Sequence, residues 1–178
     1  MWSNRPDMHT PVRHALISLA DDLGVASIPW QLGGSGLLCA LGLVDTVRDL
    51  DVVFPGSAQP ELAALLERAT GFAPEFDDRQ ERNFHSGWRA RHEYLGVELD
   101  MTAEITFDFR GGPTVRLPFE PGGTWDLEGR AIPLGPLPQW LLIYRHHNPV
   151  RAALLAPLVS DDDWNRMVSC LGVDLPPG

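Results

Sequence analysis

Residues 32–54, LGGSGLLCALGLVDTVRDLDVVF, constrain the fold of this chain more than any other segment. Two glycines and a serine follow an apolar run, and the charged letters RDLD open a second apolar run. The apolar runs predict buried strands over 25–32 and 50–54, and the glycines predict a tight turn into a helix over 35–42. A strand, a glycine turn, a helix and a second buried strand together predict a sheet covered by helices.

Apolar spacing predicts further helices and strands on both sides of this stretch. The expected helices cover residues 10–23, 59–70, 138–147, 149–159 and 161–171, and the expected strands cover 82–95 and 96–105. Thr10 and Asp161 suit the N-caps of the first and last helices, Gly71 ends the second, and a turn near Gly96 joins the two strands. Residues 106–138 are rich in Gly and Pro and predict short edge strands or a hairpin. We therefore expect an α+β fold with a mixed sheet.

Composition and charge narrow the function classes. The chain has 178 residues, enough for one well-packed domain, and a formal net charge of −10. All 14 basic residues are arginines, so a catalytic or phosphate-binding lysine is excluded. An acidic chain is a poor match for nucleic acid, which proteins grip through phosphates. Cys39 and Cys170 give no disulfide framework, and we find neither a membrane span nor a signal peptide, so we expect a cytoplasmic protein.

The acidic residues of the opening stretch predict a metal site. In a strand, Asp49 and Asp51 point to the same face, where two carboxylates repel each other unless a cation lies between them. Oxygen ligands of this kind favour Mg²⁺. The segment GVELDMT offers a further carboxylate from a neighbouring strand, either Glu98 or Asp100. Three such acids can hold two metal ions, one at an attacking oxygen and one at departing phosphates.

The glycines predict a phosphate site beside these acids. Gly33, Gly34 and Ser35 lie between a strand and a helix, where the backbone can approach a phosphate closely. Taken alone, GGSG is more often a plain loop, and a dinucleotide-binding motif would need a third glycine. Asp49 alone could be a strand-start cap, but Asp51 inside an apolar strand is costly unless something pairs with it. A phosphate cradle beside a carboxylate metal site is what nucleotidyl transfer requires.

The spacing of these residues resembles a known signature. Gly34-Ser35, thirteen further residues and then Asp49-Leu50-Asp51-Val52 resemble the motif of the nucleotidyltransferase superfamily related to DNA polymerase beta. The later ELDM resembles the third acidic strand of that family. The stretch is most similar to small bacterial enzymes of the minimal and aminoglycoside-nucleotidyltransferase kind. The resemblance covers residues 10–105 and a helical tail.

The resemblance implies a nucleotidyltransferase-like mixed sheet flanked by helices, with a catalytic domain over 1–137 and a helical C-terminal extension over 138–178. It implies a nucleoside triphosphate as donor, Mg²⁺ as cofactor, a hydroxyl of a small molecule as acceptor, and pyrophosphate as product. A homodimer with the acceptor cleft between subunits is a further expectation. The site residues that we predict are Gly33, Gly34, Ser35 and Arg48 for the nucleotide; Asp49, Asp51 and Asp100 for the metal and catalysis; and Glu98 as the rival third carboxylate. Arg89 and Arg91 are alternatives to Arg48 for phosphate contacts.

Three functions remain open on the sequence. The first is an enzyme that nucleotidylates a small hydroxylated molecule, with residues 106–138 shaping the acceptor side. The second is a non-catalytic or antitoxin-type module of the same fold, which binds a nucleotide or a protein partner. The third is transfer to a protein or an RNA; the net charge disfavours RNA, although arginines gather over residues 79–91. The sequence selects neither the triphosphate nor the acceptor.

Overall fold

The structure is a computed structural model, and it describes residues 8–78, 84–108 and 114–173. Its helices are α1 (Thr10–Val25), α2 (Gly34–Ala40), α3 (Gln59–Thr70), α4 (Leu137–His147), α5 (Pro149–Leu155) and α6 (Asp161–Leu171), with short 3₁₀ turns at Gly56–Ala58 and Ala156–Leu158. Its strands are β1 (Gln31–Leu32), β2 (Leu50–Phe54), β3 (Glu75–Asp77), β4 (Phe84–His85), β5 (Trp88–Tyr94), β6 (Val97–Ala103), β7 (Thr106–Asp108), β8 (Thr114–Arg116), β9 (Thr124–Leu127) and β10 (Arg130–Pro133).

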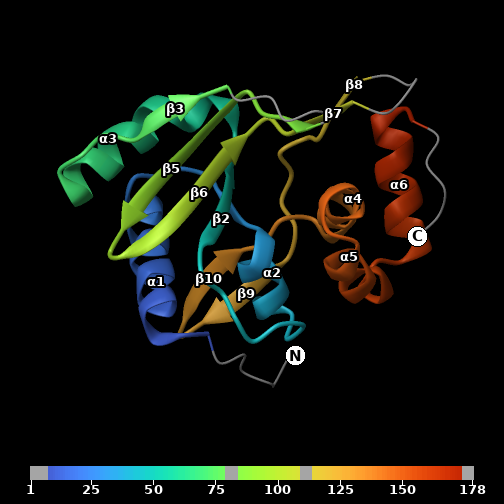
Figure 1. The fold of residues 1–178 in the computed structure, drawn as a ribbon, viewed down its shortest axis with the longest axis horizontal. Coiled ribbons are helices and arrows are strands. Elements are labelled where there is room, and N and C mark those ends of the chain that lie inside the picture. Colours follow the sequence, from blue (N-terminus) through green and yellow to red (C-terminus); the bar gives the residue numbers. More distant parts are fainter. Residues whose placement is uncertain (1–7, 79–83, 109–113, 174–178) are drawn as a thin grey trace.

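A five-stranded sheet with the order β1-β2-β6-β5-β3 forms the centre of the molecule. The pair β2 and β6 is parallel and the other neighbours are antiparallel, so the sheet is mixed. In Figure 1, α1 and α3 lie in the left half of the molecule, near the ends of β5 and β6, and α4, α5 and α6 gather at the right. The described residues thus confirm the predicted α+β fold with a mixed, helix-flanked sheet.

Most predicted elements form, but two of the predicted strands differ from the structure. The predicted strand 82–95 is divided into β4 and β5, which belong to different sheets, and the predicted strand 25–32 is mostly not a strand. The strand 50–54 and the helix 59–70 have the predicted bounds, and Gly71 ends the helix with a φ of 84°. The N-cap of α1 is His9, not Thr10, and α1 runs through Gly24 to Val25. Only the last two residues of the predicted strand 25–32 pair with a neighbour.

The last helix was also capped differently from the prediction. The side chain of Ser160, not Asp161, accepts a hydrogen bond from the backbone N–H of Asp163, at 3.1 Å. The hydroxyl of serine is short enough to reach this amide from the position before the helix. Asp161 is instead the first residue of α6, where its negative charge still favours the helix start.

The strands that follow α3 are joined by tight turns. Leu95 and Gly96, with φ of 51° and 77°, form the two-residue connection between β5 and β6. Positive φ at both positions matches the twist of an antiparallel hairpin, as predicted for Gly96. The described part of the region 106–138 forms β7 and β8, which make a small sheet with β4, and the hairpin of β9 and β10. Residues 79–83 lie outside the described residues. They include the start of the arginine-rich segment 79–91 and the first two residues of the predicted strand 82–95.

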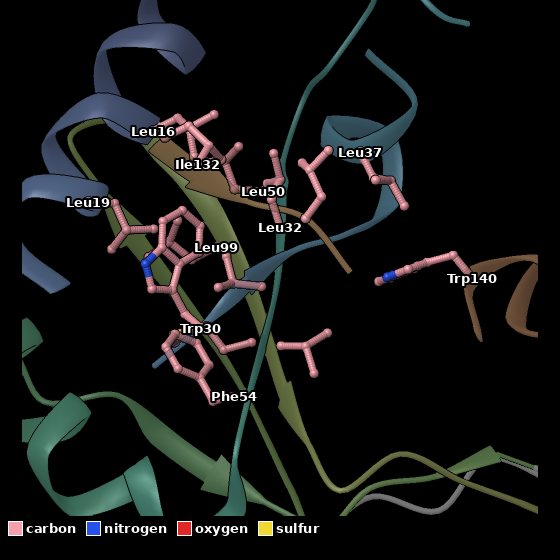
Figure 2. Packing of buried hydrophobic residues seen from close by; sticks show 14 of the residues in the cluster. Leu16, Leu19, Trp30, Leu32, Leu37, Leu50, Phe54, Leu99, Ile132 and Trp140 are labelled. Atoms are coloured by element: carbon pink, nitrogen blue, oxygen red, sulfur yellow. The ribbon is translucent and has the colours of Figure 1, made fainter. Parts of the chain in front are cut away.

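One cluster of buried apolar side chains runs from α1 through the sheet to the C-terminal helices. Figure 2 shows Leu16 of α1 beside Leu50 of β2 and Leu99 of β6, with the ring of Trp140 reaching in from α4. Trp164 of α6 belongs to the same cluster. The helices beyond residue 137 therefore share the core of the sheet, and the division at 137/138 stays a prediction.

Candidate active site

Four carboxylates lie along the adjacent starts of β2 and β6, and we call Asp49, Asp51, Glu98 and Asp100 the acid row. Asp51 and Asp100 are register partners in the parallel pair, so their side chains leave the sheet on the same face. Asp49 directly precedes β2 and is partly buried, whereas the side chain of Glu98 is 54% exposed. The fold therefore brings the four predicted acids together on one face of the sheet, and Glu98 is the exposed member of the acid row.

Asp51 is partly buried and lies near two other negative charges of the acid row. Burial, followed by the negative charges of Asp49 and Asp100, raises the pKa of Asp51 from its ordinary value of 3.8 to about 7. The positive charge of Arg151 and a hydrogen bond from the backbone of Ser35 act in the opposite direction. A further cation near Asp51 would stabilise its charged form, because nearby opposite charge offsets both burial and repulsion.

The glycine turn packs directly against Asp51. The backbone N–H of Gly33 donates to the carbonyl of Asp51 at 2.9 Å. Gly34 has a φ of 51°, and a Cβ at this position would lie 1.6 Å from Oδ2 of Asp51. Ser35, the second residue of α2, is buried, and its hydroxyl has no hydrogen-bond partner among the described residues. The glycine turn and the acid row, which were predicted from separate motifs, thus lie in direct contact.

Helix α4 supports the glycine turn from behind. A Cβ at Gly33 would lie 1.8 Å from Cζ2 of Trp140, and one at Gly135 would lie 2.1 Å from its Nε1. The backbone N–H of Gly135 donates to the carbonyl of Leu32 at 3.0 Å, next to the turn. Trp140 therefore packs between two glycine backbones, and the position of the turn depends on α4.

Asp100 already has cationic partners from β5. Arg89 donates from Nε to Oδ1 of Asp100 at 3.0 Å and from Nη2 to Oδ2 at 2.5 Å. Arg91 donates from Nη2 to the same Oδ2 at 3.4 Å, and its side chain is 62% exposed. Both arginines were alternatives to Arg48 for phosphate contacts, and here both contact a carboxylate of the acid row. Arg48, which was predicted to bind the nucleotide, is exposed.

Sequence reasoning missed Arg151, the cation from α5 whose charge acts on Asp51. Its guanidinium lies over the ring of Tyr144, 5.8 Å from the ring centroid. Asn148 caps α5 by accepting a hydrogen bond from the backbone N–H of Arg151 at 3.1 Å, which fixes the start of this helix. More than ninety residues separate Arg151 from the motif, and no local pattern marked it.

A cavity of about 160 Å³ lies farther along the same two strands. Val53, two residues after Asp51 on β2, lines it together with Gln31 and Gln139. Both glutamines are buried, and each donates its amide to a backbone carbonyl of the segment 118–120, Gln31 to Glu120 and Gln139 to Pro118. The cavity is therefore walled by a segment from the Gly- and Pro-rich region 106–138.

Within residues 8–78, 84–108 and 114–173, no group of three or more His, Cys, Asp or Glu side chains lies close enough together to hold a metal ion. Asp100, the predicted third acid, accepts hydrogen bonds from Arg89 at both of its oxygens. In the same part of the chain, no helix is long and apolar enough to cross a membrane.

Solved structures share this architecture. A Thermotoga maritima protein described as a nucleotidyltransferase superposes with a TM-score of 0.69 at 15% identity, over 82% of this chain and 90% of its own. ANT(2″)-Ia in complex with adenylyl-2″-tobramycin gives 0.54 at 15% identity, over 90% and 95% of the two chains. The lincosamide antibiotic adenylyltransferase LnuA, bound to lincomycin, gives 0.52 at 16% identity, over 82% and 97%. The fold is nucleotidyltransferase-like.

These likenesses concern structure, not sequence. No protein-family model matches the chain, and no curated protein matches it in sequence. The three structures extend over most of this chain, including segments well beyond the residues 10–105 of the sequence motif. The nucleotidyltransferase-like fold that the motif predicted is therefore confirmed by structural likeness.

Proposed function

We propose that the chain is a nucleotidyltransferase that moves a nucleoside monophosphate from a nucleoside triphosphate to a hydroxyl of a small molecule. The observation that carries this proposal is the contact of Gly34 with Asp51, where a Cβ would lie 1.6 Å from the carboxylate. This contact joins a backbone turn suited to phosphate with a carboxylate suited to a cation. A triphosphate bound as its metal complex needs both within the span of a few bonds.

The residues at the turn have complementary tasks in this proposal. Gly33 and Gly34 let the backbone approach the triphosphate, and the unpartnered hydroxyl of Ser35 has a hydrogen bond to donate to a phosphate oxygen. Arg151 supplies the positive charge that a lysine supplies in other phosphate sites, because this chain has no lysine. A guanidinium suits that task through its fixed fork of donors.

The carboxylates fit a divalent cation at Asp49 and Asp51. Their mutual repulsion, expressed in the raised pKa of Asp51, is relieved by a cation with oxygen preference such as Mg²⁺. Bound Mg²⁺ would supply neutralisation of the triphosphate and of the departing pyrophosphate. In the transfer itself, the acceptor oxygen bonds to the α-phosphorus, the bond to the bridging oxygen of the β-phosphate breaks, and Asp100 accepts the hydroxyl proton, with Glu98 as its rival.

The acceptor in this proposal is a small molecule held along β2. The cavity of about 160 Å³ is lined in part by Val53, two residues from Asp51 on β2, and would take part of a small acceptor. ANT(2″)-Ia and LnuA, which carry adenylyl-tobramycin and lincomycin, bind small hydroxylated molecules on this fold. A nucleoside triphosphate donor also agrees with the predicted cytoplasmic location, and a homodimer stays a prediction.

A second candidate is a non-catalytic module that binds a nucleotide or a protein partner. The ion pair between Arg89 and Asp100 favours it, because a carboxylate bound at both oxygens is neither a free base nor a free metal ligand. In such a module the glycine turn would still bind a nucleotide. It would do so without transfer to any hydroxyl.

A thermal-shift panel of ATP, GTP, CTP and UTP, each with and without Mg²⁺, tests the proposal. A nucleotide at about one hundred times its dissociation constant stabilises a protein by about 2.7 kcal/mol, which is readily measured. We expect a metal-dependent shift with at least one nucleotide, followed by pyrophosphate release in a screen of hydroxylated acceptors. A shift that does not depend on metal, with no pyrophosphate release, would favour the binding module. The absence of any shift would contradict the transferase and the nucleotide-binding module, and it would favour a module that binds a protein partner.

A further inference from the structure

The ion pair between Arg89 and Asp100 is the tightest charged contact in the acid row. The two residues lie on neighbouring antiparallel strands, β5 and β6, where Arg89 is the register partner of Thr102. Two donors of one guanidinium meet the two oxygens of one carboxylate, at 3.0 Å and 2.5 Å. This parallel geometry gives the strongest form of an arginine–carboxylate pair.

The pair is shielded from solvent. The side chain of Asp100 is 14% exposed and that of Arg89 is 24% exposed. Charges in such a position are screened less by salt than charges on an open surface. Arg91 makes a longer contact to Asp100, 3.4 Å, from a side chain that is 62% exposed. The two arginines thus carry equal charge but hold Asp100 with unequal strength.

The two arginines occupy most of the accepting capacity of Asp100. An ionised carboxylate has about four lone-pair sites, of which Arg89 takes two and Arg91 a third. A metal ion beside Asp100 would also meet the positive charge of the Arg89 guanidinium at short range, and like charges repel. Ligation of a metal ion by Asp100 is therefore opposed by the ion pair.

We propose that Arg89 competes with the divalent cation for Asp100, so that the third acid joins the metal site only when the guanidinium is displaced. This inference rests on the proposed function, because it presumes a metal ion at Asp49 and Asp51. It makes metal binding weak in the protein alone. The metal that arrives with a triphosphate brings phosphate oxygens to share the positive charge, and these lower the cost of separating Arg89 from Asp100.

The test measures Mn²⁺ binding in the absence of nucleotide, from the electron paramagnetic resonance signal of the free ion. Arg89→Gln should bind Mn²⁺ roughly tenfold more tightly than the original chain, because a charge-assisted pair no longer competes. Arg91→Gln removes the same charge from the longer contact and should change the affinity less than about threefold. Adding Asp100→Asn to Arg89→Gln should abolish the gain.

The pattern across these variants distinguishes competition from a general change of charge. Equal tightening in Arg89→Gln and Arg91→Gln, or unchanged or weaker binding in Arg89→Gln, would overturn the proposal. Arg89→Lys keeps the charge but loses the two-bond geometry, and it should give a smaller gain in affinity than Arg89→Gln. Thermal unfolding of each variant without metal checks that it is folded, and Arg89→Lys carries the test if Arg89→Gln is not.

The result also separates this inference from the proposed function. If the original chain binds Mn²⁺ in the presence of a nucleotide but Arg89→Gln shows no gain without it, only the competition is wrong. If neither the original chain nor any variant binds Mn²⁺, with or without nucleotide, the competition and the metal-dependent transferase are both wrong.

Discussion

Asp51 and Asp100 occupy equivalent positions on two parallel strands, and their surroundings differ. Asp51 is confronted by two like charges, and burial with those charges raises its pKa to about 7. Asp100 is held at both oxygens by Arg89. Asp100 therefore has a cation from the neighbouring strand beside it, whereas Asp51 is partly buried and faces two negative charges. Register places acids together, but the side chains around them decide what each can do.

Replacing Asp51, the acid within β2, should have the largest effect on nucleotide binding and transfer. Asp51→Asn should abolish Mg²⁺-dependent nucleotide binding and lower transfer by more than about 100-fold, because losing even a group that supports a metal ligand costs about 10- to 100-fold. Thermal shift with nucleotide and Mg²⁺, and pyrophosphate release, measure this. The fold should persist, since the change removes a repelled charge. A variant with full binding and transfer would refute the metal assignment.

Filling the space beside Asp51 should have the next largest effect. Gly34→Ala should destabilise the protein by about 1–2 kcal/mol for its positive φ and by a further 1–3 kcal/mol, roughly, for overpacking against the carboxylate. Gly42 has a φ of 71° and open space around it, so Gly42→Ala measures the backbone contribution alone. Chemical denaturation gives both values. Equal losses in the two variants would mean that Gly34 has room for a methyl group.

The pH dependence of stability should distinguish the two acids. The folded pKa of Asp51, about 7, is above its ordinary value of 3.8, so between these values the folded state holds a proton that the unfolded state has released. Its contribution to the free energy of unfolding therefore falls as pH rises from about 4 to about 7, by up to about 1.4 kcal/mol per pH unit. Urea unfolding without metal or nucleotide should show this slope in the original chain and not in Asp51→Asn.

Replacing Arg151, the cation whose charge acts on Asp51, should have a smaller effect on nucleotide binding. Arg151→Ala should weaken triphosphate binding roughly tenfold, the worth of one charge-assisted contact, and should leave binding of a nucleoside monophosphate less affected. Arg166→Ala is the matched control, because Arg166 is an exposed arginine of α6 paired with Asp163. Titration calorimetry with ATP and AMP compares them. Equal affinities in the two variants would remove Arg151 from the phosphate site.

Replacing Glu98, the exposed acid of β6, should have the smallest effect on transfer. Glu98→Gln should alter transfer less than about threefold, because a solvent-exposed charge interacts weakly with its neighbours. Asp100→Asn should lower transfer far more if Asp100 is the base. Steady-state rates of pyrophosphate release rank the two. A larger loss in Glu98→Gln would exchange the roles of the two carboxylates.

Local patterns in the sequence predicted the elements of this site well. The strand with Asp51, the glycine turn before α2 and the strand with Asp100 each carry a pattern within a few residues. The nucleotidyltransferase-like fold followed from the resemblance of these segments to a known motif. The errors concern the caps predicted at Thr10 and Asp161 and the strand predicted over 25–32, of which only Gln31 and Leu32 pair with a neighbour.

The contacts between distant segments could not be predicted in the same way. Arg151 acts on Asp51 from a helix about one hundred positions away, and spacing alone did not select it from the other arginines. Arg89 was one of three alternatives for phosphate contacts. The register of β5 and β6 places Arg91 opposite Asp100, and only the side-chain hydrogen bonds show that Arg89 holds this carboxylate more closely. Tertiary packing decides these partners, and it leaves no periodic trace in the sequence.

Trp140 packs between the backbones of Gly33 and Gly135, and this contact makes two parts of the chain inseparable in evolution and in engineering. The C-terminal helices cannot be replaced independently of the rest of the chain, because the indole of Trp140, which packs against the glycine turn, belongs to α4, the first of these helices. A larger residue at Gly33 would require a smaller one at Trp140, and the reverse. Recombinants that join the sheet of one such protein to the helices of another should therefore inherit both positions from the same parent.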